Sequence, residues 1–152
     1  MTRVDNYFAN YDQLVSHGDI GLRQEALDVL NAGIAAADPG EATRRLIRIE
    51  GDRIFIGGTP YPLGQFEHIY VFGAGKATFP IAKALDDILG DMITEGIVTC
   101  KDGQKGTLNH IGMRLASHPI PNEIGMSASQ DILDLAKRTG PKDLVFACIT
   151  GG

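Results

Sequence analysis

The sequence predicts an α/β protein with an open, mostly parallel sheet and helices on both of its faces. From His68 onward, short apolar runs typical of buried strands alternate with segments of helical periodicity. Glycines, 19 of the 152 residues, gather at the ends of the apolar runs, which indicates tight turns after strands. The sequence also stops three residues after an apolar strand, before any helix that would cover that strand. We therefore expect a Rossmann-like domain that is incomplete at its C-terminus.

The N-terminal part predicts a long helix behind an irregular arm. Residues 1–20 show no sustained period and indicate an arm or a short frayed helix. Residues 22–37 carry apolar side chains at helical spacing, and the Pro39-Gly40 pair ends the pattern. We expect residues 1–20 to be an arm and residues 21–152 to be the N-terminal α/β domain of a longer two-domain protein.

A short arginine-bearing helix and a β-hairpin are expected next. Three arginines, at positions 44, 45 and 48, suggest phosphate binding, but no glycine-rich loop accompanies them, so a solvated helix face is favoured. Residues 47–49 and 54–56 carry alternating isoleucines around a turn and predict the hairpin. Residues 57–64 contain two prolines and are expected to form a loop.

A βαβ unit opens the main sheet. Strands at His68–Phe72 and Gly96–Cys100 flank a helix at Thr78–Leu89, whose apolar residues share one face. Residues 111–116 alternate between apolar and polar side chains. This alternation predicts a strand with one solvated face, near the edge of the sheet.

The last elements are a helix and an apolar strand. Residues 123–138 are periodic for a helix, with Asn122 as its N-cap and Gly140 as its stop signal. Leu144–Ile149 is apolar throughout and is expected to be a centrally buried strand. Because the sequence ends in the turn after this strand, we interpret it as a piece of a longer chain.

Composition excludes several classes of protein. The 14 basic and 19 acidic residues give a net charge of −5 with no basic tract, which argues against a nucleic-acid partner. No secretory signal precedes the first helix, and the longest apolar run is far shorter than the ~20 residues that span a bilayer. The two cysteines, Cys100 and Cys148, are predicted to be buried thiols, consistent with a cytoplasmic location. No closed structural metal site is expected.

Three loops are expected to meet at the carboxyl edge of the parallel sheet. These loops are Gly73–Lys76, Ser117–Pro121 and Thr150–Gly152. Open α/β sheets bind ligands at this edge, and the first loop offers glycine backbone, a helix N-terminus and a lysine. An anionic ligand is the natural hypothesis. On spacing alone, a purely structural glycine turn is favoured.

Two familiar phosphate-binding motifs are absent. A dinucleotide fingerprint needs a third glycine where the chain has Thr78. A P-loop needs a glycine where the chain has Tyr70, and a serine or threonine where it has Ala77. Any phosphate site in this chain is therefore of another kind.

Together, three segments resemble the N-terminal part of the glycerate 2-kinase family, whose members are also named hydroxypyruvate reductases. The segments are Val71–Ala77, Ala116–Glu123 and Ile149–Gly152, and their order and spacing make the likeness more specific than any one of them. The likeness runs from the helix near Leu22 to the last residue. Family members are much longer, and the resemblance implies that a second domain follows.

The resemblance implies transfer of the ATP γ-phosphoryl group to the 2-hydroxyl of D-glycerate, with Mg²⁺ as a further cofactor. Lys76 matches the family's functional lysine in the cleft between domains. Its role would be to offset charge on the phosphoryl oxygens or to hold the substrate carboxylate. Gly73 and Gly75 belong to the same loop and are expected to bind substrate or phosphate through the backbone.

The other two loops supply the remaining expected site residues. Thr150, Gly151 and Gly152 match the start of a family loop that presents backbone N–H groups to an anion. His118 matches the family's His-Pro-x-Pro turn and is expected to bind substrate, with no step of the reaction assigned to it; a hydrogen-bonded loop anchor is the alternative.

Two other functions remain open at this stage. A reductase that uses a nicotinamide cofactor is supported by family names and opposed by Thr78 in place of the third glycine. A domain that binds an anion without turnover, or binds nothing, is the second alternative. Residues 1–152 alone are expected to be inactive and marginally soluble, and to associate with a second copy or another chain that covers the last strand.

Overall fold

The computed structural model describes residues 7–151. The chain divides into two compact units, residues 1–38 and residues 39–152, and each is described by itself. The expected division into an arm over residues 1–20 and a domain over residues 21–152 remains a prediction.

The described part of the first unit, residues 7–38, contains two helices. A single turn, α1 (Tyr11–Leu14), precedes the long helix α2 (Ile20–Ala36), close to the predicted bounds. Asp19 caps α2 by accepting a hydrogen bond from the backbone N–H of Leu22 at 3.1 Å. The part of the expected arm that precedes Tyr7 lies outside the described residues.

The second unit begins with helix α3 (Pro39–Leu46) and a small antiparallel sheet. Strands β1 (Ile47–Glu50) and β2 (Arg53–Ile56) form the predicted hairpin. The expectation of a loop over residues 57–64 was wrong, because β3 (Thr59–Pro62) pairs with β2. Its prolines are tolerated because β3 is at the edge of the sheet, where their missing N–H groups break no ladder.

Among the described residues the main sheet has four strands that are all parallel, where a mostly parallel sheet was predicted. They run in the order β6-β5-β4-β7. Their bounds are Ile69–Ala74 for β4, Glu95–Lys101 for β5, Gly112–Ala116 for β6 and Leu144–Ala147 for β7. The predicted edge position of β6 is confirmed.

The central position expected for the last apolar strand was wrong. Among the described residues β7 pairs with β4 alone and forms an edge of the sheet, with Leu144, Val145 and Phe146 only half-buried. An apolar run indicates that a strand is covered by neighbouring elements, but it does not specify the order of strands in the sheet.

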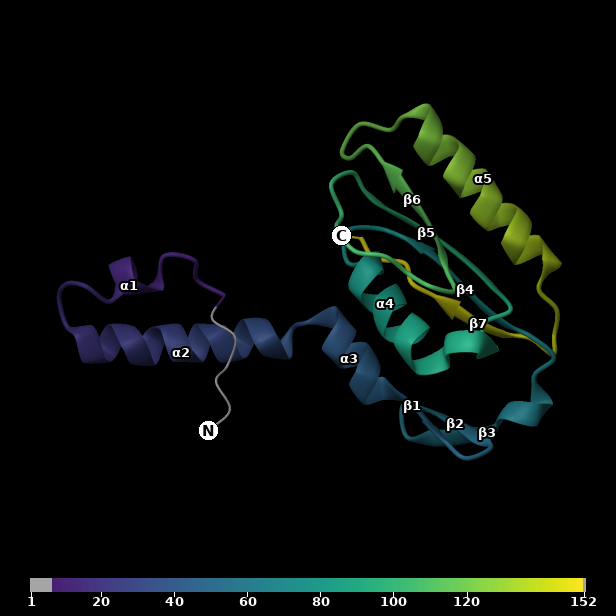
Figure 1. Ribbon diagram of the computed structural model, residues 1–152, viewed down its shortest axis with the longest axis horizontal. Helices are drawn as coiled ribbons and strands as arrows, with labels where there is room; N and C mark the ends of the chain where they lie inside the picture. The colour runs from purple at the N-terminus through teal and green to yellow at the C-terminus, as the bar shows by residue number, and fades with distance from the viewer. Residues whose placement is uncertain (1–6, 152) are drawn as a thin grey trace. The chain divides into compact units, whose positions relative to one another are not determined.

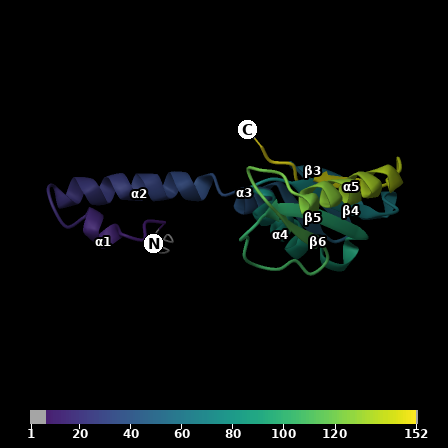
Figure 2. The same ribbon diagram turned by 90° about the horizontal axis from the view of Figure 1, so that it is seen from above.

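Helices α4 (Thr78–Leu89) and α5 (Glu123–Arg138) cover the two faces of the sheet (Figures 1 and 2). The β4–α4–β5 and β6–α5–β7 connections run in opposite directions along the sheet, so right-handed crossovers place their helices on opposite faces. Between α4 and the sheet, Leu85 of the helix packs with Val71 and Val98 of the strands, and the three form the fully buried centre of the core. The predicted α/β class is confirmed. Short 3₁₀ turns at Leu63–Gln65 and Gly90–Met92 complete the fold.

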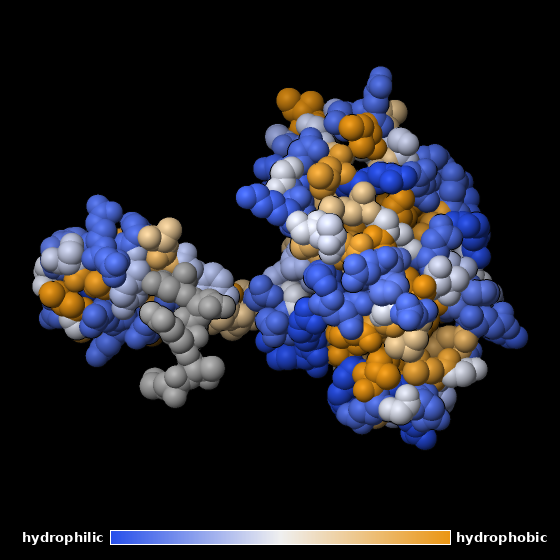
Figure 3. All heavy atoms as spheres, viewed as in Figure 1, coloured by the Kyte–Doolittle hydropathy of each residue, from blue (hydrophilic) through white to orange (hydrophobic). Residues whose placement is uncertain are grey.

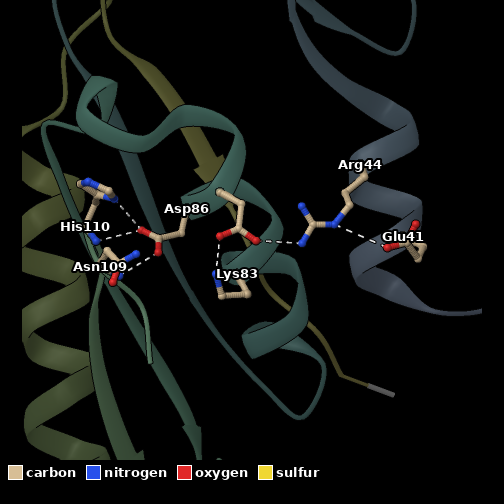
Figure 4. A network of polar contacts seen from close by, with 7 residues as sticks. Glu41, Arg44, Lys83, Asp86, Asn109 and His110 are labelled. Carbon is tan, nitrogen blue, oxygen red and sulfur yellow. Dashed lines mark hydrogen bonds and ion pairs between the residues drawn. The ribbon is translucent and has the colours of Figure 1, made fainter. Parts of the chain in front are cut away.

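A buried carboxylate fixes the loop between β5 and β6 to α4 (Figure 4). Asp86 accepts hydrogen bonds from the backbone N–H groups of Asn109, at 2.7 Å, and His110, at 2.8 Å. Its side chain is fully buried. Since this carboxylate is satisfied by backbone donors and the His110 ring, its role is to hold the loop.

Arg44 and Arg48 form contacts with protein groups. Arg44 lies between Glu41 and Asp87, 3.5 and 2.9 Å away, and links α3 to α4 (Figure 4). Arg48 pairs with Glu50 at 2.6 Å and covers the ring of Phe55. The Arg44 contacts agree with the solvated helix face that the sequence favours over a phosphate site, whereas the expected helical position of Arg48 was wrong, because Arg48 lies in β1.

Candidate functional site

The carboxyl ends of all four parallel strands surround one cavity of about 640 Å³. A volume in this range suits a small-molecule ligand. The lining comes from the end of each strand and the residues after it: Ala74–Ala77 after β4, Thr99–Lys101 in β5, Ala116–His118 after β6, and Thr150 and Gly151 after β7. The three loops predicted to meet at this edge therefore do meet there, and β5 contributes a fourth segment.

The turn between β4 and α4 is built on a glycine. Gly75 has a φ of +132°, a conformation that side chains rarely adopt. A Cβ at Gly75 would overlap Thr150, so the close approach of the two segments also requires glycine. The backbone N–H of Gly75 donates to the carbonyl of Thr99 at 3.3 Å, which ties this turn to β5.

Thr150 replaces a local cap at the start of α4. Ala77 occupies the N-cap position and has no side chain that accepts a hydrogen bond. Instead, the Thr150 Oγ1 accepts from the backbone N–H of Ala77 at 3.1 Å, and the Thr150 N–H donates to the carbonyl of Ala74 at 3.0 Å. Thr78 strengthens the joint by donating its hydroxyl to the Cys148 carbonyl at 2.8 Å. The exit of β7 and the start of α4 thus form one unit.

Gly73 lies under the site rather than in its wall. It is buried in β4, and a Cβ there would overlap the backbone of Cys148. Gly73 is not among the residues that line the cavity. Only glycine fits at position 73, because β4 contacts the backbone of Cys148, the residue after β7, at this point. The expected part of Gly73 in ligand binding remains a prediction.

The cavity carries positive charge. Lys76 and Lys101 line it with exposed side chains, and neither forms an ion pair with a described residue. No aspartate or glutamate is among the described residues of the lining, although the chain as a whole has a net charge of −5. This local excess of cationic groups favours an anionic ligand.

Lys101 was not predicted from the sequence as a residue of the cavity. Lys101 directly ends β5, as Lys76 follows β4, but no glycine turn draws attention to it. A lysine at the carboxyl end of an expected parallel strand was the signal that could have identified it.

His118 and Gly151 lie where the sequence predicts, and both line the cavity. His118 is exposed and is joined to Pro119 by a cis peptide bond. Gly152 lies outside the described residues. The structure thus brings together Gly75, Lys76, His118, Thr150 and Gly151, and their chemical roles remain predictions.

The cysteine at the cavity is not set up as a nucleophile. Cys100 is 3% exposed, and burial raises the pKa of its thiol. Burial also raises the pKa of Cys148 to about 11. The reactive thiolate is therefore disfavoured at both positions, as expected for structural thiols.

The described residues do not form a metal site. Among residues 7–151, no three histidine, cysteine, aspartate or glutamate side chains are grouped so that they could hold a metal ion. Mg²⁺ prefers oxygen ligands, above all carboxylates, and the described lining of the cavity has none. The residues present do not fit Mg²⁺, and we derive no step that depends on it.

Comparison with known proteins places the chain in a family. Residues 25–152 match the model of a family described as a domain of unknown function, DUF4147. The chain belongs to the DUF4147 family. A glycerate 2-kinase of Pyrococcus horikoshii is 30% identical over 131 residues, which are 86% of this chain and 29% of that protein. A protein of Agrobacterium vitis named "Putative hydroxypyruvate reductase" is 33% identical over 88% of this chain and 27% of its own length.

Solved structures show the same fold. A crystal structure of a Pyrococcus horikoshii protein superposes with a TM-score of 0.72 at 29% identity, covering 83% of this chain and 28% of that one. A crystal structure of a glycerate kinase from Thermotoga maritima gives a TM-score of 0.66 at 23% identity, with 84% and 28% covered. The resemblance stated from the sequence is confirmed. This DUF4147 chain spans less than a third of the length of these relatives.

Among the described residues, no helix has the length and apolar character needed to cross a membrane.

Proposed function

We propose that this DUF4147 chain is the N-terminal part of a glycerate 2-kinase, which transfers the γ-phosphoryl group of ATP to the 2-hydroxyl of D-glycerate. The product is 2-phosphoglycerate. The observation that carries the proposal is a cavity at the strand ends with two lysines and no described acidic residue. Relatives named glycerate 2-kinase and glycerate kinase support the choice of reaction.

Within this proposal, Lys76 has an electrostatic role. Its ammonium group would offset the negative charge on the transferred phosphoryl oxygens or hold the glycerate carboxylate. Lys76 and Gly151 line the cavity, and their backbone N–H groups would be presented to the phosphates of ATP, whereas those of Thr150 and Ala77 are bonded within the protein. Any Mg²⁺ would need carboxylates from outside the described lining.

The proposal includes a longer protein in which other residues close the site. Apolar side chains are exposed on the surface of the second unit (Figure 3). Those that follow the strand ends in sequence include Ile120, 74% exposed, and Ile149, 74% exposed. Coverage of such groups by a following domain or a second copy would explain why residues 1–152 alone are expected to be marginally soluble. These residues alone are expected to be inactive because phosphoryl transfer needs charged groups on both sides of the cleft. Free buried thiols are in keeping with a cytoplasmic protein.

A coupled assay of ADP release tests the reaction. The full-length protein is supplied with ATP, Mg²⁺ and D-glycerate, and we expect ADP to form only when glycerate is present. Lys76→Met should lower kcat/KM by roughly 100-fold or more, because it removes one electrostatic contact to the transition state. Lys105→Met is the matched control, since Lys105 is exposed and is not part of the cavity lining.

Reduction of hydroxypyruvate with a nicotinamide cofactor is the second candidate. The relative from Agrobacterium vitis favours it by name. Against it, Thr78 stands where a dinucleotide fingerprint has its third glycine, and its buried hydroxyl is bonded to Cys148. Oxidation of NADH or NADPH by the same preparation, without ADP release, would replace the kinase proposal with this one.

A further inference from the structure

Lys76 and Lys101 lie at the carboxyl ends of neighbouring strands, Lys76 in the turn after β4 and Lys101 as the last residue of β5. In the β4–β5 pair Ala74 is opposite Thr99, and each lysine lies two residues further along its chain. Both line the cavity, from different segments.

The backbone around Lys101 is held on both sides. The N–H of Asp102 donates to the carbonyl of Ala116 at 2.9 Å, which fixes the end of β5 against β6. The carbonyl of Lys101 itself accepts from the N–H of Gln104 at 3.1 Å. Lys101 thus starts from a fixed point in the cavity wall, between the Lys76 turn and the exit of β6.

Two ammonium groups in one cavity without a protein counterion repel each other, and bound anionic groups remove that cost. Neither lysine has a carboxylate partner among the described residues, and the lining supplies none. Lysine offers a point charge with three donors on a flexible stem, which suits phosphate oxygens approached from different directions.

We infer that Lys101 is a second anion-binding residue, and that the ligand of this cavity carries two separate anionic groups, one held at Lys76 and one at Lys101. A hydroxy acid that bears both a carboxylate and a phosphate has this chemistry. The inference rests on the proposed function for the nature of the ligand, and it assigns to Lys101 the selection of doubly anionic ligands over singly anionic ones.

Binding to the full-length protein tests this assignment by calorimetry. The probes are inorganic phosphate, with one anionic group, and 2-phosphoglycerate, with two. The wild type should bind 2-phosphoglycerate more tightly than phosphate. Lys101→Met should weaken the binding of 2-phosphoglycerate by about tenfold or more, as expected for the loss of one charge-assisted contact. It should also largely abolish the preference for 2-phosphoglycerate over phosphate.

Two controls accompany the binding series. Lys105→Met removes a lysine of the same β5–β6 connection outside the cavity lining and should leave both affinities unchanged. Lys101→Arg keeps the charge and should retain most of the preference. Because Lys101 is exposed, an unchanged melting temperature is expected for every variant.

Two results would overturn the inference. One is wild-type affinity for 2-phosphoglycerate in Lys101→Met; the other is an equal loss for both probes, which would mean that the lysines share one anionic group. These results are separable from failure of the kinase proposal. Selective binding without ADP release would contradict the reaction and keep the two-group site, whereas normal turnover in Lys101→Met would contradict the site alone.

Discussion

Helices α4 and α5 begin in different ways. At α5 the cap is local: Asn122 accepts a hydrogen bond from the backbone N–H of Gly125 at 3.0 Å. At α4 the N-cap position is Ala77, and the accepting oxygen belongs to Thr150, 73 residues further along the chain. The start of α5 is thus held by contacts among four consecutive residues, whereas the start of α4 receives a hydrogen-bond acceptor from the residues after β7.

The difference shows that the start of α4, unlike the start of α5, is bonded to a residue of the cavity. The remote cap joins the exit of β7 to the turn that carries Lys76, and both border the cavity. A ligand that contacts this joint would therefore act on the start of α4, while the start of α5 would not respond.

The largest effect is expected from adding a methyl group at the start of each helix. Gly75→Ala forces a positive φ on alanine and drives a Cβ into Thr150, so unfolding free energy should fall by about 3 kcal/mol or more. Gly125→Ala is the matched control, because its Cβ meets Ala116 at an ordinary 3.5 Å and the helix gains propensity. Urea unfolding measures both. Equal losses of unfolding free energy in the two variants would contradict the proposed difference between the starts of α4 and α5.

Removal of the remote cap, the Thr150 hydroxyl, should lower the free energy of unfolding less than Gly75→Ala does, but should weaken ligand binding. Thr150→Val keeps the shape and loses the accepting oxygen, which should lower the free energy of unfolding by about 1 kcal/mol and weaken 2-phosphoglycerate binding. Thr150→Ser retains the hydroxyl and should stay close to wild type. Stability and affinity that both survive Thr150→Val would show that α4 needs no cap from β7.

Removal of the local cap should lower the free energy of unfolding by a similar or slightly smaller amount, and should leave the affinity for 2-phosphoglycerate unchanged. Asn122→Ala deletes the acceptor for Gly125 and should lower the free energy of unfolding by about 1 kcal/mol or less, given that the N-cap of α5 is partly exposed. Asn122→Asp should restore it. Calorimetry with 2-phosphoglycerate should give the wild-type affinity, and a clear loss of affinity would contradict the separation of the two helix starts.

The smallest effect is expected at the far end of α5, where Asp143 leads into β7. Hydrogen bonds from the Gly140 N–H, at 2.7 Å, and from His68 lower the pKa of the Asp143 carboxyl. A carboxyl whose pKa is lower in the fold stabilises it above its unfolded pKa of about 4 and loses that contribution as the pH falls through the folded value. Urea unfolding from pH 7 to pH 3 should therefore show a shallower fall for Asp143→Asn than for wild type. Identical slopes would contradict this.

The sequence was sufficient where the signal is local. The period of residues 123–138 and the asparagine before it predicted α5 and its cap, and the apolar runs predicted the βαβ unit around α4. These features depend on neighbours along the chain, which the sequence places directly.

Prediction failed where a feature depends on distant pairing. The edge position of β7 follows from its pairing with β4, and β3 follows from pairing with β2. Lys101 becomes a site residue only because β5 lies beside β4. Thr150 was predicted for an anion loop, but its hydrogen bond to Ala77 needs the folded sheet.

Hydrogen exchange with and without 2-phosphoglycerate tests the central claim most directly, that the strand ends of this sheet form an anion site joined to the start of α4. In the full-length protein, ligand should slow exchange in peptides that cover residues 74–79, 99–102 and 149–151. Peptides over residues 122–127, at the start of α5, should exchange at the same rate in both states. Slowed exchange at the start of α5, or none at the strand ends when the ligand is bound, would contradict the account.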